Sequence, residues 1–139
     1  MAEPIGLASG VLTLVIFAHK SCLTLYKTIQ SFKTHPKRVR NLIDELEALI
    51  GVLESLDETI KLHTDVDIPA LDLPLRRCSS ACDEFLHELQ KCCARSGGDR
   101  QSFRDWAKLR YMGDDIDDFT DSLAAYKSTI NIALTDMQL

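Results

Sequence analysis

The feature that most constrains this chain is the spacing of its apolar residues, which recur every three or four positions through four long segments. This spacing puts apolar side chains on one stripe of a helix, whereas a half-buried strand would alternate every two residues. Prolines, glycines and capping residues delimit the segments. The four stripes comprise Ala8, Val11, Val15, Ala18, Cys22, Leu25, Ile29 and Phe32; Val39, Leu42, Leu46, Leu49, Leu53, Leu56 and Ile60; Cys78, Cys82, Phe85, Leu89 and Cys92; and Ile116, Phe119, Leu123, Tyr126, Ile130, Ala133 and Met137.

The boundaries of these segments predict the rest of the architecture. The first helix begins near Pro4, the second runs from Pro36 to about His63, a loop covers Thr64–Pro74, and the third helix follows Pro74. A short fourth helix is expected through Trp106 to about Tyr111, and Asp114 opens the last long helix. We therefore expect an all-α fold, in which residues 1–139 form one antiparallel bundle of four long helices and one short helix.

Charge and motif content exclude several functions. The net charge of −5 argues against nucleic-acid binding. The chain has no glycine-rich phosphate loop and no nucleophile elbow, and its histidines lack the spacing of a catalytic triad or metal site. The expectation is that the protein is not an enzyme and binds no cofactor.

The five cysteines suggest a zinc site only weakly. Cys78 and Cys82 are one helical turn apart and could share an ion, but Cys92 lies about 15 Å further along the helix. No second Cys/His pair has ligand spacing, so these cysteines are predicted to be small core residues and no metal is expected. The odd number of cysteines and the lack of a secretory signal favour a reducing cytoplasm.

An acidic group opens the last helix, but it does not match a calcium loop. Such a loop needs a central glycine and a terminal glutamate, which this group lacks. Acids in a first helical turn are expected from the helix dipole alone. The residues concerned are Asp114, Asp115, Asp117, Asp118 and Asp121.

Basic residues cluster at the junction of the first two helices. Residues 1–43 carry six basic side chains and one acid, a net charge of +5, while the rest of the chain carries ten basic and twenty acidic side chains. The cluster either completes the C-terminal end of the first helix or contacts anionic lipid headgroups. The candidate headgroup contacts are Lys33, Lys37, Arg38 and Arg40, with His35 beside them.

The stretch from Pro4 to His19 carries no charge on any face, which is unusual for a surface helix. Ala2, Gly6 and Gly10 form a ladder of small residues of the kind that lets helices approach closely in lipid. One interpretation is a central helix buried on all sides; the other is a membrane-inserting helix. Sixteen residues span about 24 Å, which makes a lone upright helix marginal for a hydrocarbon layer of about 30 Å. The candidate inserting residues are Ile5, Gly6, Leu7, Gly10, Val11, Leu12, Leu14, Val15, Ile16 and Phe17.

Three stretches give the chain a family resemblance. "AEPIGLASGVLTLVIFAHKSC", "VRNLIDELEALIGVLESL" and "LAAYKSTINIALTDMQL" resemble the fungal HeLo-like N-terminal domain of receptors of the signal-transducing nucleotide-binding class and of amyloid-controlled cell-death effectors. The resemblance covers essentially the whole chain. It implies a helical bundle that permeabilises membranes through its N-terminal helix, here through Ala2, Gly6, Gly10 and the apolar residues from Ile5 to Ala18.

Two functions follow as expectations. The first is an effector domain of programmed cell death or innate immune signalling, cytoplasmic at rest and at the plasma membrane when active. Its expected partners are anionic membrane lipids, further copies of itself, and an upstream receptor or amyloid template. The alternative is a soluble interaction or regulatory module of such a receptor, with no membrane activity.

Overall fold

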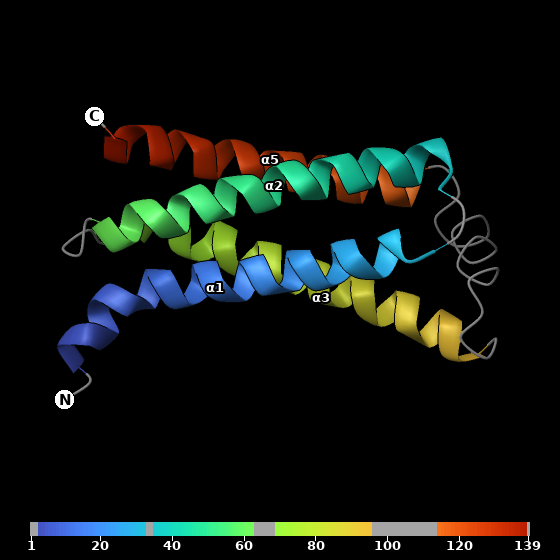
Figure 1. The fold of residues 1–139 in the computed structure, drawn as a ribbon, viewed down its shortest axis with the longest axis horizontal. Coiled ribbons are helices and arrows are strands. Elements are labelled where there is room, and N and C mark those ends of the chain that lie inside the picture. Colours follow the sequence, from blue (N-terminus) through green and yellow to red (C-terminus); the bar gives the residue numbers. More distant parts are fainter. Residues whose placement is uncertain (1–2, 33–34, 63–68, 96–113, 139) are drawn as a thin grey trace.

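The computed structural model describes residues 3–32, 35–62, 69–95 and 114–138; within these ranges, the side chains of residues 3–9, 92–95, 114–115 and 138 are not described. The described residues form helices and no strand, which confirms the all-α prediction. The short helix expected around Trp106–Tyr111 lies outside the described residues. The long helices are α1 (Glu3–Gln30), α2 (Lys37–Leu62), α3 (Asp72–Arg95) and α5 (Asp114–Gln138), with a 3₁₀ turn, η1 (Pro69–Leu71), before α3 (Figure 1).

Consecutive long helices run in opposite directions, as predicted for an antiparallel bundle (Figure 1). Helix α1 packs against α2 and α3, and α5 packs against the same two helices. As a result, α1 and α3 are parallel neighbours, and so are α2 and α5. This arrangement places the N-terminus of α1 and the turn between α1 and α2 at opposite ends of the bundle (Figure 1).

The apolar stripes form the core. Every described stripe position of α1, α2 and α3 is buried, which confirms the periodicity there. The stripe of α5 is less completely buried: Leu123 and Ile130 are in the core, whereas Tyr126 and Met137 are half-buried against it. Four core residues lie outside the predicted stripes, namely Ile50, Leu71, Leu75 and Leu134.

Helix α3 begins at Asp72, two residues before Pro74, where the sequence had predicted a loop. Proline is compatible with a first helical turn because the amide hydrogens there have no partner within the helix. Leu71 of η1 and Leu75 of α3 flank this start and are both fully buried in the core.

Polar and aromatic contacts fix α5 against its two neighbours. Lys127 Nζ lies 2.6 Å from Glu45 Oε2 of α2, and both side chains are mostly buried. On the other side, the rings of Phe85 and Phe119 stack with centroids 4.4 Å apart and planes 6° from parallel. These contacts anchor α5 independently of α1.

The core of α2 offers a direct test of the fold. Leu53 is fully buried, whereas Leu62 at the end of the same helix is 81% exposed. Leu53→Ala should lower the free energy of unfolding by about 2–5 kcal/mol through lost burial and a cavity. Leu62→Ala, the matched control, should change it by less than about 0.5 kcal/mol. Urea denaturation followed by circular dichroism measures both, and equal losses would contradict the packing described.

Candidate functional site

The outward face of α1 is a continuous exposed stripe. Its described members follow one another at steps of three or four residues, apart from the adjacent pair Ile16 and Phe17, and lie opposite the buried stripe of the same helix. The first half of this outward stripe is uncharged, its second half carries two lysines, and none of its described side chains is acidic. The described residues of the outward stripe are Gly10, Thr13, Ile16, Phe17, Lys20, Thr24 and Lys27.

Two large apolar side chains lie on the outward stripe in contact with solvent. Ile16 is 50% exposed and Phe17 is 55% exposed. The interpretation of the uncharged segment as a helix buried on all sides is therefore wrong for its described part. The bundle covers one stripe of α1 and leaves a second apolar surface outside.

The predicted membrane-inserting residues divide between the two faces. Val11 and Val15 are buried in the core, so they meet lipid only if α1 leaves the bundle. Leu12 and Leu14 are half-buried between the two faces. Ile16, Phe17 and Gly10 are exposed, whereas the side chains of Ile5, Gly6 and Leu7 lie outside the description.

Gly10 has no packing role within the bundle. It is exposed, and a Cβ built on it meets no atom within 4 Å. The expectation that this glycine admits a neighbouring helix is thus wrong for contacts within the chain. Since glycine costs an exposed helix about 1 kcal/mol relative to alanine, its presence here has no stabilising explanation.

Polar contacts hold the edges of α1 to α2. Nε2 of His19 lies 3.0 Å from Oε2 of Glu54, and the Tyr26 hydroxyl donates a 2.9 Å hydrogen bond to Oε2 of Glu47. The hydrogen bond to Glu47 raises the pKa of Tyr26, because a phenolate would lose it. Acidic side chains also flank the outward stripe: Glu54, Asp57 and Glu58 line a groove beside Ile16.

The basic turn between α1 and α2 is largely occupied by contacts within the protein. Nε2 of His35 lies 3.0 Å from the carbonyl oxygen of Ile29, near the end of α1. Nη1 of Arg40 donates a 2.8 Å hydrogen bond to the carbonyl of His35, and Arg38 Nε lies 3.3 Å from Asp117 Oδ2 of α5. Lys37 is exposed. Lys33 lies outside the described residues.

The two candidate membrane features do not lie together. The uncharged half of α1 belongs to its N-terminal part, whereas Lys37, Arg38 and Arg40 lie at the opposite end of the bundle (Figure 1). Lys20 and Lys27, which were not among the predicted headgroup contacts, instead share the outward stripe with Phe17. Their positions, three and ten residues after Phe17, are the sequence signal that identifies them as members of the same helical face.

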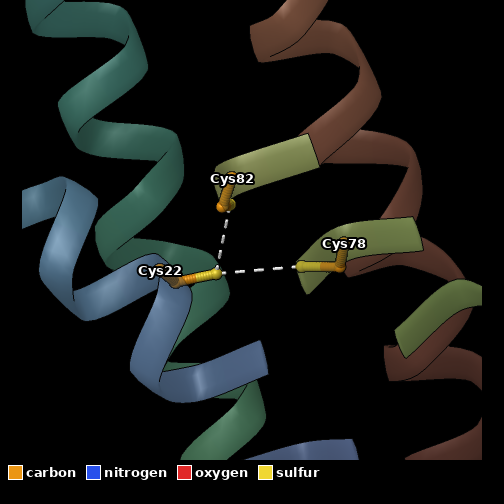
Figure 2. Close-up of side chains that lie close together, drawn as sticks. All are labelled: Cys22, Cys78 and Cys82. Carbon is orange, nitrogen blue, oxygen red and sulfur yellow. Dashed lines mark hydrogen bonds between the residues drawn. The ribbon is translucent and has the colours of Figure 1, made fainter. Parts of the chain in front are cut away.

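Three cysteines meet between α1 and α3 (Figure 2). Sγ of Cys22 lies 3.7 Å from Sγ of Cys78 and 3.7 Å from Sγ of Cys82, and all three side chains are fully buried. Sequence spacing identified the pair on α3 but not Cys22, since spacing along one helix carries no information about its neighbour. The core placement predicted for Cys78 and Cys82 is confirmed; the side chain of Cys92 lies outside the description.

The three thiols differ in acidity because they share hydrogen bonds. The pKa of Cys78 is lowered because Cys22 and Cys82 can donate to its thiolate. The pKa of Cys22 is raised, first by its hydrogen bond with Cys78 and then by burial. The pKa of Cys82 is raised by its hydrogen bonds with Cys22 and Cys78 and by burial. The thiolate is the form that acts as nucleophile or metal ligand, and within the cluster Cys22 is the residue whose sulfur lies within hydrogen-bonding distance of both others.

The cluster supplies three of the four ligands that structural zinc takes. Within the described part of the chain, the sulfurs of Cys22, Cys78 and Cys82 form the sole group of three or more potential ligands close enough to share an ion. No histidine or carboxylate joins them in that group. Zinc in structural sites is tetrahedral and four-coordinate, so this cluster is an incomplete match.

We expect the cluster to hold no stoichiometric zinc. Protein purified from zinc-supplemented medium should contain well below one ion per chain by elemental analysis, because the described residues offer three ligands where structural zinc takes four. Cys78→Ala with Cys82→Ala should lower stability by a few kcal/mol at most, through lost packing. One zinc per chain in the wild type that disappears in this double variant would contradict the prediction.

None of the described helices is both long enough and apolar enough to cross a membrane.

Comparison with known proteins gives one result. The model of the family described as "Pigment biosynthesis cluster protein PigL N-terminal" matches residues 2–139. No curated protein and no solved structure gives a significant match. The matched family is a family of helical domains, and its description does not mention the HeLo-like domain. The HeLo-like resemblance therefore stays an expectation. With nearly its whole length matched, the chain belongs to the PigL N-terminal domain family.

Proposed function

We propose that this domain is a membrane-disrupting effector of fungal cell death or innate immune signalling, which acts through α1 after several copies have been brought together. The observation that carries the proposal is the outward stripe of α1, which exposes Ile16 and Phe17 and has no acidic residue among its described side chains. A helix with apolar and basic residues on one exposed face suits a location in the lipid interface. The HeLo-like resemblance of the sequence is consistent with this activity.

The resting bundle is only partly adapted to an anionic surface. Lys20 and Lys27 of the outward stripe favour contact with anionic headgroups, each by about 1 kcal/mol. Glu54 and Glu58 on α2, and Asp83 on α3, lie beside the stripe and oppose such contact. Movement of α1 away from its neighbours would separate its lysines from these acids. This charge arrangement favours activation by release of α1 over constitutive binding.

A span that is too short when alone can act as part of an assembly. The uncharged run of α1 is shorter than a hydrocarbon layer is thick, so an upright single helix is disfavoured. Close packing of several copies along Ala2, Gly6 and Gly10 would let Thr13 and Lys20 face a hydrated interior. We therefore assign the active form to a homo-oligomer, recruited by an upstream receptor or template.

The runner-up function is a helical interaction module without membrane activity. The family description, which refers to a pigment biosynthesis cluster protein, names no membrane role. An exposed, mainly apolar groove between η1 and α5, lined by Ala70, Ile132 and Met137 among others, would suit a protein partner. Under this alternative, the outward stripe of α1 also contacts protein rather than lipid.

Dye release from anionic vesicles distinguishes the two functions. Clustered wild-type domain should release dye from phosphatidylserine-containing vesicles, less from neutral vesicles, and less again as salt is added. Ile16→Ser with Phe17→Ser should abolish release, because it removes the exposed apolar side chains of the outward stripe. Ile132→Ser, which alters a 63% exposed side chain on α5, is the matched control and should leak like the wild type. If the wild type never leaks, or all variants leak equally, the membrane function is wrong.

Gly10 tests the contribution of helix association. Gly10→Leu should leave the fold and initial vesicle binding intact, since the space around it is open, yet strongly reduce leakage by preventing close helix packing. Gly51→Leu is the matched control, because Gly51 is also an exposed helical glycine with no atom within 4 Å of its would-be Cβ. Circular dichroism, vesicle co-sedimentation and dye release measure the three properties. Normal leakage by a folded Gly10→Leu variant would exclude the association step.

A further inference from the structure

The three-cysteine cluster joins two helices that the proposed function requires to separate. Cys22 belongs to α1, and Cys78 and Cys82 occupy successive turns of α3 (Figure 2). Because α1 and α3 are parallel neighbours, Cys22 lies within 3.7 Å, sulfur to sulfur, of both partners. A disulfide between Cys22 and either partner would therefore join α1 to α3 with little movement of the sulfurs.

Small residues make this approach possible. Ala18 and Cys22 are fully buried on α1, and Ser21 hydrogen-bonds Ser79 of α3 with their Oγ atoms 3.1 Å apart. The serine pair lies one position from Cys22 on α1 and one from Cys78 on α3. It therefore holds the two helices in register at the level of the sulfurs.

A surface groove lies next to the cluster in sequence. It runs between α1 and α3 and is lined by Ser21 and Ser79, the neighbours of Cys22 and Cys78, and by Lys20 and Asp83. The sulfurs themselves are not exposed. A small neutral oxidant thus needs only a local separation of the two helices to reach them.

We propose that Cys22 and Cys78 are a redox modification site, at which a peroxide converts the two thiols into a disulfide that ties α1 to α3. The thiolate of one cysteine of the pair attacks one peroxide oxygen, the O–O bond breaks, and a sulfenic acid and hydroxide form. The sulfur of the other cysteine then attacks the sulfenic sulfur, an S–S bond forms and water leaves, while the thiol proton neutralises the hydroxide. In balance, two thiols and one hydrogen peroxide yield one disulfide and two waters.

The choice of the pair follows from the geometry of the cluster. Cys22 lies 3.7 Å from Cys78, so the thiolate of either residue can attack the peroxide and the other can resolve the sulfenic acid. Cys78 is the favoured partner on α3 because it adjoins Ser79, whose hydrogen bond with Ser21 holds the two helices together next to Cys22. Cys82 is at the same distance from Cys22 and serves as a second partner when Cys78 is absent.

The disulfide would hold the resting state. With Cys22 bonded to α3, α1 as a whole cannot leave the bundle. Reduction restores the free thiols and allows release. This consequence for leakage rests on the proposed membrane function, whereas formation of the disulfide does not.

Peptide mapping tests the disulfide directly. The folded domain is treated with hydrogen peroxide, remaining thiols are blocked, and the protein is digested with trypsin without reduction. Wild type should yield Ser21–Lys27 joined to Cys78–Lys91, with the mass of the two peptides together less two hydrogen atoms and plus one blocking group on the third cysteine. Cys22→Ala should lose this species, and Cys82→Ala, the matched control, should retain it. A bridge within Cys78–Lys91 alone, or oxidation without any joined peptide, would overturn the proposal.

Two further measurements test whether the disulfide keeps α1 in the bundle. Peroxide should raise the melting temperature of wild type, reversibly with dithiothreitol, and should not raise that of Cys22→Ala. In vesicle assays the oxidised wild type should lose dye release while Cys22→Ala keeps it. If the reduced wild type does not cause leakage either, the proposed membrane function is wrong, and peptide mapping alone still tests whether the disulfide forms. If protein in which the disulfide has formed completely causes as much leakage as reduced protein, the disulfide does not hold α1 in the resting state.

Discussion

The structure depends on the burial of one stripe of α1 against α2 and α3. Val11, Val15, Leu25 and Ile29 are nearly or fully buried in that interface. At about 1.5–3 kcal/mol for each such side chain, these four contribute about 6–12 kcal/mol relative to exposure in water. That amount is comparable to the net stability of a typical domain, about 5–15 kcal/mol. In water, release of α1 is therefore nearly equivalent to unfolding, and an apolar environment must replace the lost burial.

The outward stripe gives this constraint a functional consequence. A helix that was polar outside would gain nothing from lipid, and a helix buried on all sides would be inaccessible to it. Helix α1 is intermediate, since Ile16 and Phe17 are already exposed while Val11 and Val15 are not. A lipid surface can then bind α1 first through its outward stripe. Burial of Val11 and Val15 in lipid can afterwards replace the burial that they lose when α1 leaves the bundle. The acids beside the stripe, including Glu54 and Asp83, oppose this step until α1 moves.

Periodicity predicted most of the fold because it is a property of single helices. The three-or-four spacing identified all seven buried stripe residues of α2, from Val39 to Ile60. It could not predict which helices are neighbours, because parallel and antiparallel partners bury the same stripe. For that reason Cys78 and Cys82 were expected in the core, but their contact with Cys22 was not. The start of α3 before Pro74 was missed because proline marks both loops and first helical turns.

The same limit applies to the candidate membrane residues. The apolar spacing predicted that Val11 and Val15 are buried, but the uncharged run from Pro4 to His19 has no polar face, so the sequence could not show whether the opposite side of the helix is also covered. The neighbours α2 and α3 cover Val11 and Val15 and leave Phe17 outside.

The basic residues illustrate how position changes an interpretation. In sequence, Lys37, Arg38 and Arg40 suggest either completion of the end of the first helix or contact with anionic headgroups. In the bundle they lie at the end opposite the uncharged half of α1, where Arg40 and His35 complete the turn and Arg38 pairs with Asp117. Lys20 and Lys27 are the cations on the same face as Phe17. Contact with headgroups and contact with acyl chains can then occur along one helix, so the turn is free to serve the fold rather than the membrane.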